Sequence, residues 1–259
     1  EIYTLSLHDA LPILVDIREV SKGEKAAIVG SGPAGLTVAI ILALRGYDVT
    51  IFERKEHIGG MLRYGIPEFR LPKNILDRYQ KRLRQLGILI RPNTTIGGAL
   101  HLDDLFNDGY GAIFIGSGTW RARRLGVPGE SLGNVHYSID YLQNPDVYEL
   151  GDRVAVIGSG NSAMDAARTA LRKGSRSVTV YARGSTVSAS PRELDYLLAD
   201  GAELLYGMGI QKITADGPVF IQRTFSEAGE TISESEPTLF PADSTIIAIS
   251  QQQIGRAHV

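Results

Sequence analysis

Two glycine-rich runs of the same type are the residues most suited to chemistry in this chain. The first, residues 30–35, has glycine at positions 30, 32 and 35, and the second, residues 158–163, has glycine at 158 and 160 and ends in alanine. Glycine permits a tight turn and lets backbone N–H groups approach a pyrophosphate, and a helix start adds unpaired donors with partial positive charge. Each run is therefore typical of a turn that holds the phosphates of a dinucleotide.

The elements predicted around each run support this interpretation. Apolar residues 26–29 and 154–157 precede the two runs and predict strands, and the residues after them predict helices over 33–44 and 161–172. A glycine pattern between a strand and a helix is more specific than the pattern alone. We therefore expect two bound dinucleotides, between which a hydride or an electron pair would pass.

The residue after the next strand distinguishes the two sites. Glu53 follows a strand predicted over 47–52, about 20 residues after the first run, where a carboxylate accepts hydrogen bonds from a free ribose hydroxyl and repels a 2′-phosphate. Arg183 follows a strand predicted over 178–182, and a guanidinium pairs with a phosphate dianion. The first site is expected to bind FAD or NAD and the second NADP. Either side chain could instead be an ordinary surface residue at a strand end.

Length and composition limit the fold and the partners. The 259 residues fit two units of roughly 110 to 130 residues better than one core, and we place the boundary near Tyr141. The net charge of −2 and the pI near 6.3 argue against a nucleic-acid partner. The longest apolar stretch, residues 38–44, is too short to span a bilayer. We therefore expect no membrane partner and a cytoplasmic location.

The chain contains no cysteine. It therefore carries neither a CxxC redox pair nor an iron–sulfur cluster held by its own thiolates, and a redox centre must be an organic cofactor. His57, His101 and His136 lack metal-ligand spacing, and no Gly-x-Ser-x-Gly nucleophile elbow is present. We predict no metal site and no catalytic acid, base or nucleophile, because hydride transfer depends mainly on how two cofactors are held.

Both ends of the chain resemble translated sequencing adapter. Residues 5–13 can be encoded by CTTTCCCTACACGACGCTCTTCCGATC and residues 254–259 by ATCGGAAGAGCACACGTC. The end of the first string and the start of the second are one sequence read from opposite strands. We therefore expect residues 1–13 and 254–259 to be artefacts of assembly and exclude them as one excludes a fusion scar.

Strand and helix signals alternate between these ends and predict a parallel sheet in each half. Residues 57–72 are rich in glycine and proline and predict an extended loop. The other expected elements are a helix over 75–86, strands over 88–90, 112–115 and 244–249, a helix over 192–198, a hairpin turn at Asp216-Gly217 and an exposed polar segment over 227–236.

The motifs in combination resemble the glutamate synthase small (beta) subunit family, which is related to the N-terminal region of dihydropyrimidine dehydrogenase. The resemblance covers nearly all of residues 23–250 and rests on the two glycine runs, Glu53, and residues 58–61, 65–67 and 69–72. It implies an α/β fold of two Rossmann-like dinucleotide-binding domains. Residues 14–141 would form the N-terminal part of an FAD domain, and residues 142–252 an NAD(P)H domain inserted within it.

The resemblance also implies a set of residues for each cofactor. At the first site the FAD pyrophosphate would be held by Gly30, Gly32, Pro33, Ala34, Gly35 and Leu36, its ribose by Glu53, and the flavin region by Gly59, Gly60, Met61 and Arg70. At the second site NADPH would be held by Gly158, Gly160, Asn161, Ser162 and Ala163, by Arg183 at the 2′-phosphate, and by Ala248, Ile249 and Ser250 along the nucleotide.

The implied activity is that of an FAD-dependent NAD(P)H oxidoreductase, which passes hydride from NADPH to FAD and electrons onward to an iron–sulfur domain or a large catalytic subunit. The chain departs from the family at Ala182, where a basic pair usually begins, and around residues 188–190, where another basic residue is replaced. These departures leave NADH possible. The family's cysteine-rich N-terminal domain and its C-terminal return to the FAD domain are also missing, so we expect an internal fragment with an incomplete FAD domain.

Two other functions remain open from the sequence. The chain could be a nucleotide-binding module without turnover of its own. It could also be a relative of the flavoprotein disulfide reductases that lacks their redox cysteines.

Overall fold

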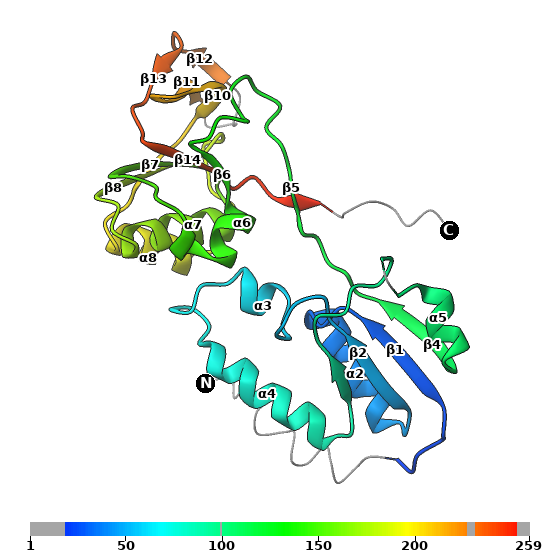
Figure 1. Ribbon diagram of the computed structural model, residues 1–259. Helices are drawn as coiled ribbons and strands as arrows, with labels where there is room; N and C mark the ends of the chain where they lie inside the picture. Colours follow the sequence, from blue (N-terminus) through cyan, green and yellow to red (C-terminus); the bar gives the residue numbers. More distant parts are fainter. Residues whose placement is uncertain (1–18, 99, 227–230, 253–259) are drawn as a thin grey trace. The chain divides into compact units, whose positions relative to one another are not determined.

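The computed structural model describes residues 19–98, 100–226 and 231–252, and the chain divides into two compact units, Glu1–Gly118 and Thr119–Val259 (Figure 1). The segments interpreted as adapter, residues 1–13 and 254–259, lie outside the described residues. The division comes earlier in the chain than the boundary predicted near Tyr141. The reason is that β6 (Val135–Tyr137) pairs with β14 (Ser244–Ile247), which joins the residues before Tyr141 to the second unit.

The first unit is built on a parallel sheet with the strand order β3-β2-β1-β4. Its strands are β1 (Lys25–Val29), β2 (Asp48–Phe52), β3 (Leu89–Arg91) and β4 (Tyr110–Ile115), and its longer helices are α2 (Pro33–Leu44), α4 (Lys73–Gln85) and α5 (Leu102–Asn107). Apolar side chains from β1, β2, α2 and α4 form its main core. The central strands are buried almost continuously, as parallel strands covered on both faces are expected to be.

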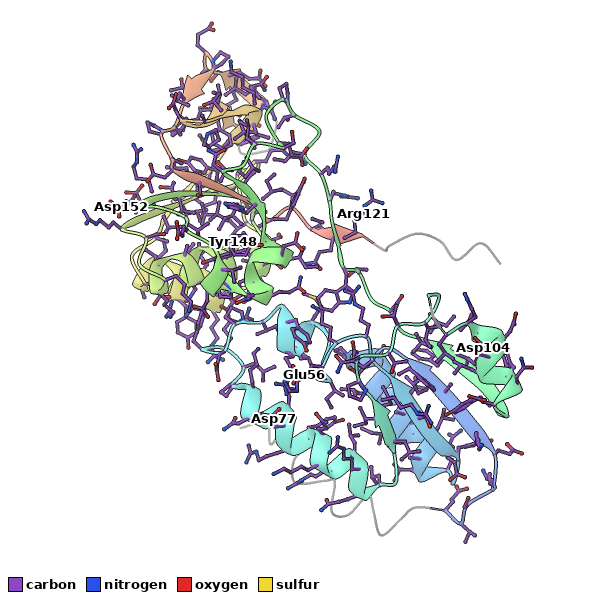
Figure 2. The ribbon with its side chains drawn as sticks, viewed as in Figure 1. Glu56, Asp77, Asp104, Arg121, Tyr148 and Asp152 are labelled. Atoms are coloured by element: carbon purple, nitrogen blue, oxygen red, sulfur yellow. The ribbon has the colours of Figure 1, made fainter. Side chains whose placement is uncertain are left out.

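The helix predicted over residues 33–44 is confirmed as α2, which begins at Pro33, where the missing N–H costs nothing. The prediction of an extended loop over residues 57–72 is wrong in part, because this stretch contains the one-turn helix α3 (Met61–Tyr64). Gly60, with φ at +53°, turns the chain into this helix, and the chain leaves it at Gly65. An ion pair between Arg63 and Asp77, the latter labelled in Figure 2, then ties α3 to α4.

The second unit contains a parallel sheet of five strands in the order β6-β14-β7-β8-β9. Its remaining strands are β7 (Arg153–Ile157), β8 (Ser177–Tyr181) and β9 (Glu203–Leu205), and its helices are α6 (Ser138–Gln143), the short η1 (Pro145–Val147), α7 (Asn161–Arg172) and α8 (Pro191–Ala199). The helices predicted over 161–172 and 192–198 are confirmed as α7 and α8. Small side chains on α7 pack against apolar residues of β7, β8 and β14 to form the core.

A smaller antiparallel sheet projects from this unit and is labelled β10 to β13 in Figure 1. It consists of β10 (Met208–Thr214), β11 (Gly217–Phe225), β12 (Thr231–Glu234) and β13 (Thr238–Leu239). The predicted hairpin turn is confirmed, since Thr214 pairs with Gly217 where β10 and β11 meet. Stacking of Tyr181 on Phe220, with ring centroids 4.5 Å apart, joins the two sheets. The pair β5 (Arg121–Ala122) and β15 (Gln251–Gln252) completes the unit.

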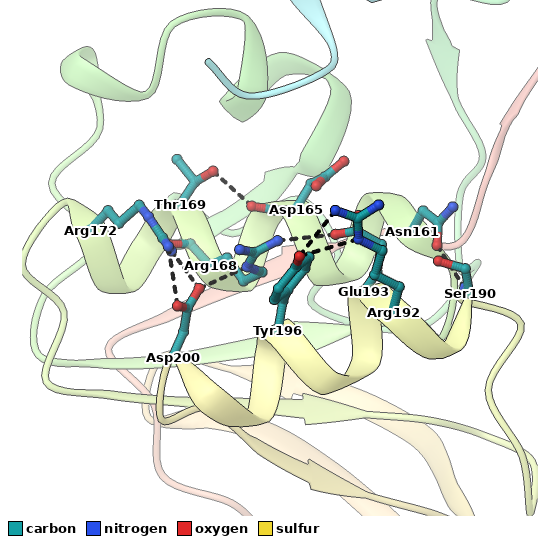
Figure 3. Close-up of polar contacts among 10 residues, drawn as sticks. All are labelled: Asn161, Asp165, Arg168, Thr169, Arg172, Ser190, Arg192, Glu193, Tyr196 and Asp200. Carbon is teal, nitrogen blue, oxygen red and sulfur yellow. Dashed lines mark hydrogen bonds and ion pairs between the residues drawn. The ribbon is translucent and has the colours of Figure 1, made fainter. Parts of the chain in front are cut away.

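A network of charged side chains holds α7 to α8 (Figure 3). Arg168 on α7 is almost fully buried and pairs with Glu193 at 3.0 Å and with Asp200 at 2.7 Å. Arg172 reaches the same Asp200 carboxylate at 2.6 Å. Burying a charge is costly unless it is paired, so these contacts fix the position of α8 beside α7.

Candidate nucleotide-binding sites

The first glycine turn connects β1 to α2, and its three glycines have different surroundings. A β-carbon added to Gly30 would lie 2.5 Å from the carbonyl oxygen of Gly116, and one added to Gly35 would lie 2.0 Å from that of Gly30. Both distances are too short for any side chain, so these glycines permit close packing of backbone. A β-carbon at Gly32 would meet nothing within 4 Å. Gly32 therefore faces open space, as a glycine that admits a phosphate should.

The start of α2 is suited to an anion. Its N-cap residue is Gly32, no side chain caps the first turn, and the first turn carries no acidic residue. Pro33 and Ala34 are exposed there, whereas Leu36 is buried in the core and donates its backbone N–H to Gly32 at 2.9 Å. The uncapped end thus offers N–H donors and the positive end of the helix dipole to a phosphate.

Glu53 lies directly beside this turn, at the end of β2. Its Oε2 accepts a hydrogen bond of 2.9 Å from the backbone N–H of Ser31 and a second from the Ser31 hydroxyl, and its Oε1 accepts one of 2.9 Å from the N–H of Lys55. A carboxylate offers about four lone-pair sites, so this one can also accept a ribose hydroxyl. Ser31 is fully buried and is not among the residues predicted from the sequence. The sequence signal that could have identified Ser31 is a small polar residue inside a glycine run.

The loop before α3 lies against the same turn. The N–H of Gly59 donates to the carbonyl oxygen of Ser31 at 3.0 Å, and a β-carbon added to Gly60 would lie 2.8 Å from the Cα of Gly32. The structure therefore brings Gly59 and Gly60 together with the glycine run, and Met61 follows as the first residue of α3. Arg70 lies farther along the chain, where its N–H donates to Pro67 at 3.0 Å. Its role near a flavin stays a prediction.

The second glycine turn connects β7 to α7 and repeats these features. A β-carbon at Gly158 would lie 2.4 Å from the carbonyl oxygen of Ala248 and 3.2 Å from the Cβ of Ala163, which is fully buried. Gly160 is more open, since its nearest neighbour would be the Ser188 hydroxyl at 3.5 Å. It is also the N-cap of α7, whose first turn has no side-chain cap and no acidic residue. This helix start is therefore also suited to a phosphate.

A cavity of about 840 Å³ opens over this second turn, within the range of about 300–1,000 Å³ typical of small-molecule and cofactor pockets. It brings together most of the predicted residues of the site: Gly158, Gly160, Asn161, Ser162, Arg183, Ala248, Ile249 and Ser250. The strand order explains this, because β7 lies between β8 and β14 and all three run parallel. The three segments that follow these strands meet at the carboxyl edge of the sheet, where α/β proteins bind ligands.

Four arginines line the cavity: Arg123, Arg124, Arg183 and Arg223. Only Arg183 is among the residues predicted from the sequence. Arg123 and Arg124 belong to a basic cluster at residues 121–124, which was a usable signal. Arg223 lies on β11, and no local pattern marks it, because its position depends on how the antiparallel sheet packs. The abundance of guanidinium groups favours an anionic ligand such as a phosphorylated nucleotide.

The loop after Arg183 is tied to the glycine turn. The N–H groups of Ser188 and Ala189 donate to the carbonyl oxygen of Ser159 at 2.9 and 2.8 Å, and that of Ser190 donates to the Asn161 side chain at 2.9 Å, a contact drawn in Figure 3. Asn161 therefore orients the loop with its side-chain oxygen. Arg172, by contrast, pairs with Asp200 on the α8 side.

Within residues 19–98, 100–226 and 231–252 no group of three or more histidine, aspartate or glutamate side chains could hold a metal ion. Over the same part of the chain, no helix combines the length and the apolar character that crossing a bilayer requires.

Two units, each with a glycine turn between an interior strand of a parallel sheet and an uncapped helix, define a protein of the two-dinucleotide-domain class. The chain belongs to the pyridine nucleotide-disulphide oxidoreductase family, which matches residues 25–253. This assignment agrees with the α/β fold of two Rossmann-like domains predicted from the sequence.

Curated relatives confirm the resemblance to glutamate synthase small subunits. The chain is 33% identical over 255 residues to the glutamate synthase [NADPH] small chain of Escherichia coli K12, covering 87% of this chain and 54% of that one. It is 40% identical over 193 residues to the NADP(+)-dependent formate dehydrogenase subunit beta of Moorella thermoacetica, covering 72% of this chain and 27% of that one. The chain thus spans about half the length, or less, of these relatives.

Solved structures share the fold at lower identity. FprA from Mycobacterium tuberculosis in complex with NADPH has a TM-score of 0.75 at 18% identity, over 92% of this chain and 73% of that one. The thioredoxin reductase of T. acidophilum has a TM-score of 0.66 at 20% identity, over 87% of this chain and 76% of that one.

Proposed function

We propose that this chain is the nucleotide-binding part of an FAD-dependent NAD(P)H oxidoreductase of the glutamate synthase small-subunit type. The observation that carries the proposal is the contrast between the two turns. A buried carboxylate, Glu53, lies beside the first turn, whereas arginines line the cavity over the second. FAD has a free adenosine ribose and suits the carboxylate, and NADPH carries a 2′-phosphate and suits the arginines.

The two glycine turns can bind these cofactors through backbone N–H groups. Gly32 and Gly160 leave the helix starts uncapped, so N–H groups of α2 and α7 can bind each pyrophosphate. A bound FAD would supply a two-electron acceptor for the hydride of NADPH. The chain would contribute by holding and orienting both nucleotides, and no side chain is required as acid or base.

We further propose that the electrons leave through an iron–sulfur domain or a large catalytic subunit outside this chain. Support comes from the names of the relatives, which are a small chain of glutamate synthase and a beta subunit of formate dehydrogenase. The absence of cysteine from the sequence excludes a thiolate-held cluster in this chain itself. The cytoplasmic location stays a prediction.

The chain shares its fold with a thioredoxin reductase. This similarity does not indicate disulfide chemistry, because the chain contains no cysteine. The second candidate function is a nucleotide-binding module without turnover. It requires only the two glycine turns and their uncapped helix starts, which the described residues provide.

The test is the absorbance spectrum of the purified 259-residue chain after incubation with FAD and removal of excess FAD, followed by anaerobic NADPH. Retention of oxidised flavin and its bleaching by NADPH are the expected results. A colourless protein that still binds NADPH would establish the module instead. A protein that binds neither nucleotide would overturn both functions.

A further inference from the structure

We propose that Arg223 is a specificity-determining residue of the second site and binds the 2′-phosphate of NADPH together with Arg183. This inference rests on the proposed function and extends it to a residue on the antiparallel sheet. Position 182, just before Arg183, is an alanine, so the end of β8 supplies one guanidinium. Two guanidinium groups bind a phosphate dianion more tightly than one does.

Backbone hydrogen bonds bring Arg223 to the end of β8. The N–H of Arg223 donates to the carbonyl oxygen of Gly207 at 2.8 Å, and the N–H of Gly207 donates to that of Gly184 at 3.1 Å. Gly184 is the neighbour of Arg183 in the sequence. The next residue, Met208, donates its N–H to Ala182 at 2.9 Å. One residue, Gly207, which directly precedes β10, therefore separates the backbone of Arg223 from the segment that carries Arg183.

The Arg223 side chain extends along the cavity wall because Gly209 has no side chain. A β-carbon added to Gly209 would lie 3.3 Å from Cζ and 3.4 Å from Nη1 of Arg223, so the guanidinium occupies the space that any other residue would fill. Gly209 and Arg223 both line the cavity. The guanidinium is thus part of the wall and not a side chain directed away from it.

The neighbouring carboxylate holds Arg223 and leaves donors for a ligand. Glu234 on β12 accepts a hydrogen bond from Nε of Arg223 at 2.7 Å, and the Arg223 side chain remains 30% exposed. Arginine has five N–H donors, and this contact uses one. The donors on Nη1 and Nη2 keep the fork geometry that matches phosphate oxygens.

Arg123, another arginine of the cavity, lies toward a different strand. The N–H of Arg123 donates to the carbonyl oxygen of Ser250 at 3.1 Å, which places it beside the segment that follows β14. β14 and β8 lie on opposite sides of β7. Arg223, unlike Arg123, is therefore grouped with Arg183, on the side where the residue after the second strand meets the adenosine ribose.

The experiment is calorimetric titration of the full chain with adenosine 2′,5′-bisphosphate and with 5′-AMP, which differ only in the 2′-phosphate and need no flavin. The variants are Arg223→Gln and Arg223→Lys. The matched control is Arg176→Gln, which removes an arginine of the same unit that pairs with Asp152 at 3.3 Å, is 82% exposed and lies outside the cavity lining.

We expect Arg223→Gln to weaken bisphosphate binding about 10- to 100-fold while 5′-AMP binding changes little, since a hydrogen bond to a charged group is lost only with the first probe. Arg223→Lys should weaken it less, because the charge remains. Arg176→Gln should leave both affinities unchanged.

Three results would count against the inference. If the native chain prefers the bisphosphate and Arg223→Gln keeps the same preference, the role of Arg223 is refuted and the proposed function stands. If Arg223→Gln loses both probes equally, the residue is structural and the inference also fails. If the native chain binds neither probe, the proposed function fails together with the inference.

Discussion

The backbone N–H and the hydroxyl of Ser31 both donate to one carboxylate oxygen of Glu53, the N–H at 2.9 Å, so the first glycine turn and the end of β2 are held together by a buried carboxylate. The same serine accepts from Gly59 through its carbonyl oxygen at 3.0 Å. Glu53 therefore stabilises the fold of the first unit even without a bound ligand. Its substitution should affect both the fold and the cofactor.

We expect Glu53→Ala to lower the free energy of unfolding of the first unit by about 1–3 kcal/mol, because a buried N–H loses its acceptor, and to reduce FAD retention. Urea denaturation and the flavin absorbance of the purified variant measure the two effects. Glu56→Ala is the control, since Glu56 is an exposed neighbour paired only loosely with His57 at 3.7 Å. Equal behaviour of the two variants would contradict the role given to Glu53.

Substitutions at two glycines of the first turn should distinguish a role in packing from a role in cofactor binding. Gly35→Ala should destabilise the unit, because the new β-carbon would lie 2.0 Å from the Gly30 carbonyl oxygen. The backbone would have to shift to relieve this clash. Gly32→Ala should fold, because Gly32 has an ordinary φ of −70° and open space around it, yet lose FAD. Thermal unfolding and flavin content distinguish these outcomes. A Gly32→Ala protein that retains full flavin would show that no phosphate approaches Gly32.

The buried ion pair between α7 and α8 should matter more for stability than an exposed one. Glu193→Ala removes one of the carboxylates that pair with the buried Arg168, and we expect a loss of up to about 3 kcal/mol. The control is Asp152→Asn, which breaks an exposed pair with Arg176 and should cost less than about 1 kcal/mol. Denaturant titration of both variants gives the comparison, and similar losses would contradict it.

The same network predicts that the stability of the protein depends on pH in the acidic range. The Arg172 side chain, through its hydrogen bonds, lowers the pKa of Asp200 from its ordinary value of 3.8, and Arg168 lowers it further against the opposing effect of burial. The folded state therefore binds fewer protons than the unfolded state. The stabilisation is complete above the ordinary pKa and is lost as the pH falls through the depressed one.

Asp200→Asn should remove this part of the acid dependence. The measurement is the urea midpoint of the native chain and of the variant, taken from about pH 6 downward through the ordinary carboxyl range. We expect the two midpoints to differ most at the upper end and to converge as the pH falls. A difference that stays constant over the whole range would refute the assignment to Asp200.

Much of the fold could be predicted from local signals. The helices at residues 33–44 and 161–172 are found where apolar periodicity, Pro33 and the glycine turns predict them. The strand–turn–helix order around each glycine run was equally predictable, since these features depend on interactions over a few neighbouring residues. The single turn of α3 was missed, because it depends on one glycine with a positive φ.

The extent of the second unit and the full wall of its cavity were not predictable in this way. β6 joins the second unit by pairing with β14, more than a hundred residues later, and this pairing moves the boundary away from Tyr141. Arg223 reaches the cavity only because β10 and β11 fold back along the end of β8. Local sequence constrains backbone angles and the burial of each face, whereas the meeting of distant side chains depends on strand pairing and packing across the whole unit.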